Sequence, residues 1–134
     1  MKPIVATLLA LPLMAASPPA QPPFDVHLDM PQDKGPQHVN VLVREFPVGG
    51  ASGWHRHPGV EIAYLLEGEM TLEQEGRPLR RLKPGESFLM PRGVPHNGAN
   101  IGAVPARLVI TYVLDKDAPL RTPVDPPSFE PSHP

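Results

Sequence analysis

The chain has 134 residues, which is room for a single domain. Hydrophobic residues make up 40% of it, enough for a core, and its 21 prolines favour turns over long helices. The formal net charge of −2 provides no basic surface, so we expect no nucleic-acid partner. The absence of cysteine excludes disulfides and thiolate chemistry.

Residues 1–20 are typical of a signal peptide that runs into the start of a proline-rich linker. Lys2 precedes an uninterrupted apolar run over residues 4–16, which is closed by small residues. The run is shorter than the roughly 20 residues of a membrane span, and Pro12 would break a buried helix. The sequence therefore predicts an exported protein, periplasmic or secreted, without a transmembrane anchor in the mature chain.

Residues 21–118 are predicted to form one all-β domain. Segments of alternating or β-branched apolar residues are expected to be strands, and they cover residues 24–30, 37–46, 60–66, 69–74, 87–91 and 106–114. Outside the leader no helical period persists, so the pattern favours a sandwich or barrel. Residues 119–134 are proline-rich and are predicted to be a disordered tail, although residues 118–124 are compatible with packing on the domain.

A short stretch of the chain, GWHRHPGVE, places chemistry-bearing residues close together. In an extended strand, His55 and His57 point to the same face because side chains two residues apart share a direction. Pro58 and Gly59 can then reverse the chain and bring Glu61 alongside. Two such histidines also occur by chance in surface turns, so this stretch alone does not show whether they form part of a metal site.

A third histidine, His96, lies between residues that fix a backbone turn, Pro91, Gly93 and Pro95. Three imidazoles and one carboxylate suit one divalent transition metal ion, which can be iron, manganese, nickel, copper or zinc, whereas calcium and magnesium prefer oxygen. The alternative is a metal-free polar cluster, which is costly to bury unless every group is hydrogen-bonded.

The complete spacing forms two motifs. The first is Gly49-x5-His55-x-His57-x3-Glu61-x6-Gly68, and the second is Gly85-x5-Pro91-x-Gly93-x2-His96-x3-Asn100. Together they resemble the two motifs of the cupin superfamily, directly over residues 49–100 and by strand pattern over most of residues 24–114. The resemblance to small single-domain proteins of the cupin_2 type implies a double-stranded β-helix, a jelly-roll barrel, with a metal held inside by His55, His57, Glu61 and His96.

Fold and metal site together do not determine a function. A metal-dependent oxidoreductase, for example a dioxygenase acting on a small organic substrate, is expected because four ligands leave free positions on a six-coordinate ion. A non-catalytic protein of the cell envelope that binds a metal or small ligand, or a metal-dependent isomerase or decarboxylase, are the alternatives. The sequence identifies no catalytic residue outside the ligand set. The resemblance and the unpaired sheet edges of a small jelly roll favour a homodimer.

Overall fold

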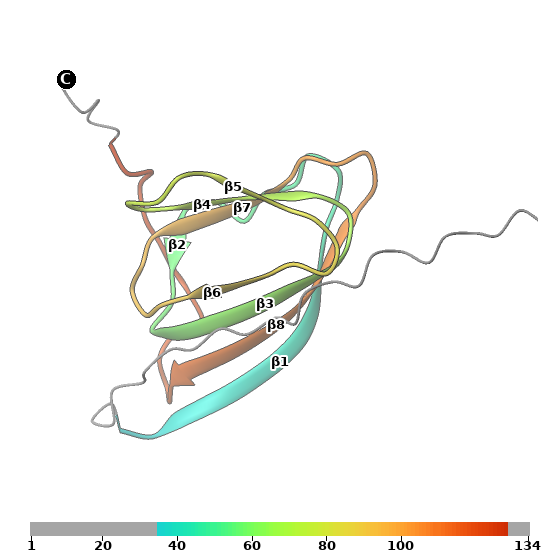
Figure 1. Cartoon of the computed structure of the whole chain (residues 1–134). Coiled ribbons are helices and arrows are strands. Elements are labelled where there is room, and N and C mark those ends of the chain that lie inside the picture. The colour runs from blue at the N-terminus through green and yellow to red at the C-terminus, as the bar shows by residue number, and fades with distance from the viewer. Residues whose placement is uncertain (1–34, 129–134) are drawn as a thin grey trace, which may run out of the picture.

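A computed structural model describes residues 35–128, which form two antiparallel β-sheets packed face to face (Figure 1). Within this range there is no helix, so none could span a membrane. The nine strands are β1 (Gln37–Phe46), β2 (His55–Arg56), β3 (Gly59–Glu67), β4 (Met70–Gln74), β5 (Arg80–Leu82), β6 (Ser87–Met90), β7 (His96–Asn100), β8 (Ala106–Asp115) and β9 (Thr122–Pro123). The predicted all-β fold is confirmed. The leader, the strand predicted over residues 24–30 and residues 129–134 lie outside the described range.

Each sheet carries some of the predicted metal ligands on its inner strands. One sheet has the order β1-β8-β3-β6 and the other β5-β4-β7-β2-β9. In the first sheet, Glu61 on β3 is paired with Tyr112 on β8. In the second, His55 on β2 is paired with His96 on β7. Each sheet therefore contributes part of one cluster to the space between them.

Alternation along β8 builds the core. Every second residue of this strand is buried, in the order Ala106, Leu108, Ile110, Tyr112 and Leu114. This is the two-residue period of a strand with one face inward. Apolar side chains of β4 and β5 meet them from the facing sheet. Burying each large aliphatic side chain stabilises the fold by about 1.5–3 kcal/mol. The polar cluster therefore lies next to a well-packed apolar core.

The chain crosses from one sheet to the other at Pro58 and Gly59, between β2 and β3. A Cβ added to Gly59 would lie 2.0 Å from the carbonyl oxygen of Val113, so only glycine allows β3 to approach β8 this closely. The crossing carries the chain from His57 to Glu61 around a corner. The expected chain reversal at Pro58-Gly59 is thus a change of sheet.

Residues 118–124, which the sequence left compatible with packing on the domain, do pack on it: they include β9, which pairs with β2 beyond the predicted boundary at residue 118. Arg121 Nη1 donates to the carbonyl oxygen of Ser52 at 3.0 Å, and the amide of Val124 donates to the carbonyl oxygen of Trp54 at 3.1 Å. Proline-rich composition suggested disorder, but proline is tolerated in an edge strand, where one side of the backbone needs no partner. Residues 119–124 therefore belong to the barrel.

Candidate metal centre

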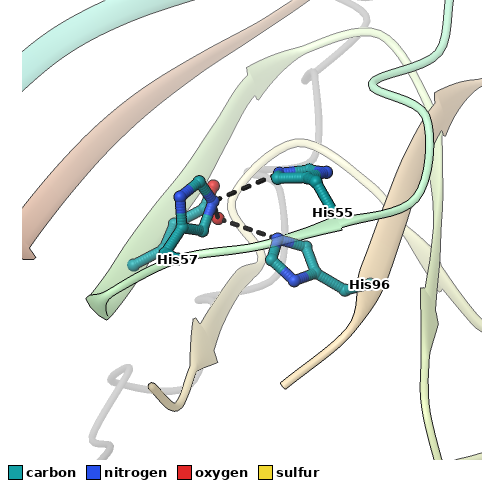
Figure 2. A group of neighbouring side chains, drawn as sticks. His55, His57 and His96 are labelled. Carbon is teal, nitrogen blue, oxygen red and sulfur yellow. Dashed lines mark hydrogen bonds and ion pairs between the residues drawn. The ribbon is translucent and has the colours of Figure 1, made fainter. Parts of the chain in front are cut away.

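The structure brings the four predicted ligands together inside the barrel. Their ligand atoms all lie within 4.8 Å of one another, and all four residues are buried. Figure 2 shows the imidazole rings of His55, His57 and His96 pointing toward one another. His57 Nε2 lies 3.1 Å from His55 Nε2 and 3.0 Å from Glu61 Oε2, and the same Glu61 oxygen lies 3.1 Å from His96 Nε2.

The strand geometry around each ligand directs its side chain into the barrel. His55 and His57 are both buried while Arg56 between them is exposed, as the alternation of an extended chain requires. His96 begins β7 directly across from His55, so the two rings meet with centroids 4.3 Å apart. Glu61 lies inward on β3, in the opposite sheet. The cluster consequently links the two sheets across the interior.

In each of the three histidines of the cluster, the Nδ1 atom is hydrogen-bonded to a backbone carbonyl group. The Nδ1 atoms of His55, His57 and His96 donate to the carbonyl oxygens of Gly53 at 2.7 Å, Leu120 at 2.6 Å and Val94 at 2.9 Å. A carbonyl oxygen only accepts hydrogen bonds, so each Nδ1 carries a proton and each ring turns its Nε2 atom inward. This is the arrangement of histidines that ligate metals.

The inward donor set fits a metal ion. Two Nε2 atoms 3.1 Å apart lie next to a carboxylate oxygen, so three atoms that can ligate a metal meet in one place. Adjacent ligands bound to one ion at about 2.1 Å are separated by about 3.0 Å in octahedral geometry. The observed spacings of 3.0–3.1 Å agree with this value. The residues present therefore suit one divalent transition metal ion.

Burial and mutual contacts shift the protonation of these groups. Burial lowers the pKa of His55 to about 4, although its hydrogen bond to Gly53 opposes the shift. Burial alone would raise the pKa of Glu61, but its contacts with His57 and His96 outweigh this effect and lower the pKa to about 2. At neutral pH His55 is thus a neutral nitrogen ligand and Glu61 an anionic oxygen ligand, the states that metal binding requires.

Tyr112 is a site residue that the sequence analysis missed. It lies beside the cluster, with its ring centroid 4.9 Å from that of His57, and it is paired with Glu61 across β8 and β3. Burial raises the pKa of its hydroxyl, and the negative charge of Glu61 raises this pKa further. The hydroxyl stays protonated at neutral pH and can donate a hydrogen bond. Its position in the alternation of β8 was the available signal.

A small cavity of about 30 Å³ adjoins the cluster. Ligand residues His55, Glu61 and His96 line it together with Tyr112, and most of its remaining wall is apolar. The other lining residues are Arg44, Phe46, Ser52, Met70, Thr71, Leu72, Leu82, Phe88, Gly98, Leu108 and Ile110. A water needs roughly 10–15 Å³ measured in this way, so the space holds about two water molecules.

Two further motif or strand residues have other roles. Tyr64 is 40% exposed and lies outside the barrel, so it does not reach the cluster. Asn100 is buried and its Nδ2 donates to three backbone carbonyl oxygens, those of Phe46, Pro47 and Val104. Its Oδ1 accepts from the amide of Gly102. Asn100 therefore stabilises the turn that follows β7.

Curated proteins of known name share part of this sequence. The dimethylsulfoniopropionate lyase DddQ of Ruegeria pomeroyi is 44% identical over 50 residues, which cover 37% of this chain and 25% of that protein. Oxalate oxidase GF-2.8 of Triticum aestivum is 30% identical over 95 residues, 63% of this chain and 42% of that protein. Oxalate oxidase 1 of Hordeum vulgare is 28% identical over 120 residues, 72% of this chain and 60% of that protein. The chain thus spans only part of each relative.

Solved structures share the fold. The crystal structure of DddQ from Ruegeria pomeroyi superposes with a TM-score of 0.57 at 29% identity and covers 63% of this chain and 42% of that one. Oxalate oxidase in complex with the substrate analogue glycolate gives 0.54 at 27% identity, covering 60% and 44%. A cupin superfamily protein from Desulfitobacterium hafniense gives 0.53 at 18% identity, covering 57% and 68%, which supports the fold alone. The cupin-domain family profile matches residues 42–112, so the chain belongs to the cupin family and has its jelly-roll fold.

Proposed function

We propose that this cupin is a metal-dependent oxidoreductase that acts on a small organic substrate. The observation that carries the proposal is the convergence of three inward Nε2 atoms and one carboxylate beside a cavity. Four protein ligands leave one or two positions on a six-coordinate ion for substrate or oxygen. When bound there, the ion supplies Lewis-acid and redox chemistry.

The chain's own residues orient and protonate the substrate. Tyr112 keeps its hydroxyl proton, so it can donate to a substrate oxygen or hold a proton next to the cluster. No hydrogen-bond partner for this hydroxyl lies among residues 35–128, so it is available. The apolar wall excludes bulk water, which strengthens polar contacts inside the cavity.

Relatives with oxidase activity in their names support the redox assignment. Oxalate oxidases of wheat and barley match the chain in sequence, and a solved oxalate oxidase matches it in fold. The small cavity favours a substrate of few atoms. Because the chain spans only part of these relatives, the substrate itself does not follow from them.

Oxygen uptake tests this proposal. The protein is stripped with a chelator, reloaded separately with Fe²⁺, Mn²⁺, Ni²⁺, Cu²⁺ or Zn²⁺, and supplied with a panel of small alcohols, aldehydes and acids in an oxygen-electrode cell. We expect substrate-dependent oxygen consumption with a redox-active ion and none with Zn²⁺ or in a Glu61→Ala variant. Tight metal binding with no consumption of any compound would favour the non-catalytic binding protein.

The match to DddQ favours a second candidate, a metal-dependent lyase or decarboxylase that needs no oxygen. Such a reaction uses the same ligands and the same proton on Tyr112. Product formation from a candidate substrate under argon distinguishes it from the oxidase, because only the oxidase stops when oxygen is removed.

We further propose that the protein is exported and is a homodimer. The charged and apolar leader over residues 2–16 supports export. Exposed apolar side chains on the outer face of one sheet support association, since a second copy would cover them. They are Val39, Val41 and Val43 on β1 with Ile62 and Tyr64 on β3.

A further inference from the structure

Arg44 is a cation in the wall of the metal-site cavity. It lies on β1, paired with Leu108 of β8, and lines the cavity together with the ligands His55, Glu61 and His96. Its guanidinium carbon lies 4.8 Å from the ring centroid of Phe46, which holds the group against the apolar wall. Among residues 35–128 no hydrogen bond or ion pair engages the guanidinium, although it is half-buried.

The positive charge of Arg44 lies in the wall of the cavity. Arg44 and Tyr112 both line the same small space. A half-buried guanidinium has five donors arranged in a planar fork, and this geometry matches a carboxylate.

The cavity wall carries a positive charge, on Arg44, that no negative charge of the wall balances. Among the cavity-lining residues, Glu61 is the only carboxylate. Glu61 lies against His57 and His96, at 3.0 and 3.1 Å, so no carboxylate of the cavity wall is left to pair with Arg44. Buried or half-buried charge of one sign is costly unless a counter-charge accompanies it. A neutral substrate would leave this imbalance, whereas an anionic one removes it.

We infer that Arg44 is the carboxylate anchor of the substrate, so that the substrate class is a small organic acid. This inference rests on the proposed function, because it assigns the ligand of the same metal site. The carboxylate lies on the guanidinium of Arg44, and the rest of the molecule extends toward the ligand cluster and the Tyr112 hydroxyl.

The size of the cavity limits which organic acids can bind there. The cavity has room for about two water molecules, so it favours the smallest organic acids, of two carbons such as acetate or glycolate. Even these are larger than the observed space, and the partly buried side chain of Arg44 has to move to admit them. Longer or aromatic acids would require the buried core residues to move.

Binding, rather than turnover, provides the test. Glycolate is titrated by calorimetry into protein loaded with Mn²⁺, in the wild type and in the variants Arg44→Gln, Arg44→Lys and Arg107→Gln. Arg107 is the matched control because it pairs with Glu67 at 3.1 Å on the exposed surface. We expect Arg44→Gln to weaken glycolate about 10- to 100-fold, the range of a lost charge-assisted hydrogen bond, and Arg44→Lys to weaken it less. Arg107→Gln should bind like the wild type.

A neutral ligand of the same shape completes the design. Glycolamide replaces the carboxylate by an amide, and we expect the wild type to bind it at least tenfold more weakly than glycolate. Mn²⁺ content and melting temperature are measured for each variant, so that a variant that is misfolded or lacks metal is recognised and Arg44→Lys is used in its place. Equal binding of glycolate by the wild type and Arg44→Gln, equal binding of glycolate and glycolamide, or no binding of glycolate by the wild type overturns the inference.

The outcome separates this inference from the proposed function. Loss of glycolate affinity in Arg44→Gln supports the anchor even if no compound is oxidised, in which case the oxidoreductase proposal alone fails. Oxygen consumption with a neutral substrate that is unaffected by Arg44→Gln supports the oxidoreductase and overturns the anchor.

Discussion

Replacing His57 by alanine should remove the metal and the stability that the metal provides. The substitution deletes one Nε2 ligand and the hydrogen bond from Nδ1 to Leu120, 2.6 Å long. The lost hydrogen bond and the packing against Tyr112 cost about 1–2 kcal/mol in the free energy of unfolding. An ion present at 100 times its Kd adds about 2.7 kcal/mol to the native state, and the variant forfeits this as well.

The two contributions separate when the melting temperature is measured with and without a chelator. For a domain of this size, 1 kcal/mol corresponds to about 4–8 °C. With a chelator, His57→Ala should melt about 4–16 °C below the wild type; with saturating metal, the difference should grow by a further 10–20 °C or so. Elemental analysis should give one equivalent of metal for the wild type and far less for the variant.

Arg56→Ala is the matched control, because Arg56 lies between the two histidines and is exposed. Its metal content and melting temperature should equal those of the wild type. A full equivalent of metal in His57→Ala, or a wild-type melting temperature that does not respond to metal, would refute the proposed centre.

Four further predictions follow from the structure and the sequence. Burial lowers the pKa of His55 to about 4, from 6.5 in the unfolded chain, so between these pH values the folded state binds fewer protons than the unfolded state. The free energy of unfolding of the metal-free protein should therefore be highest above pH 6.5 and fall as the pH is lowered from 6.5 to 4, which chemical denaturation across this range will measure. Asn100→Ala removes the amide that donates to three backbone carbonyl oxygens and should lower the free energy of unfolding by about 2–4 kcal/mol in urea titrations, whereas an unchanged value would contradict its structural role. Mass spectrometry of protein from its native host should find a mature N-terminus between Ser17 and Phe24, and intact Met1 in the cytoplasm would contradict export. Light scattering should give a dimer at micromolar concentration that Val41→Glu on the exposed sheet face dissociates; a monomeric wild type would contradict the dimer.

The sequence predicted the arrangement of the ligands where local geometry controls it. The two-residue period of an extended chain places His55 and His57 on one face, and the corner at Pro58-Gly59 brings Glu61 to them. His96 lies 35 residues beyond Glu61, so spacing alone could not place it, and its inclusion depended on the resemblance to cupins. The predicted strands match β1, β3, β4, β6 and β8 for the same local reason, whereas the short strands β5, β7 and β9 were not predicted.

Contacts made at long range in the sequence were not predictable. The carbonyl of Leu120 that fixes His57 lies 63 residues away, in a proline-rich segment whose packing the sequence left open. Tyr112 was visible only as one more apolar position of β8, since nothing local relates it to Glu61 on another strand. Nothing local shows either that the barrel turns the side chain of Arg44 toward the cavity.

The bond from His57 to Leu120 also orders events during folding. Residues that ligate the ion end at His96, but the carbonyl that fixes the tautomer of His57 belongs to a segment synthesised later. The ring of His57 therefore gains its orienting hydrogen bond only after the end of the chain has joined the barrel as β9. A chain that ended before β9 would keep all four candidate ligands but leave Nδ1 of His57 without this partner.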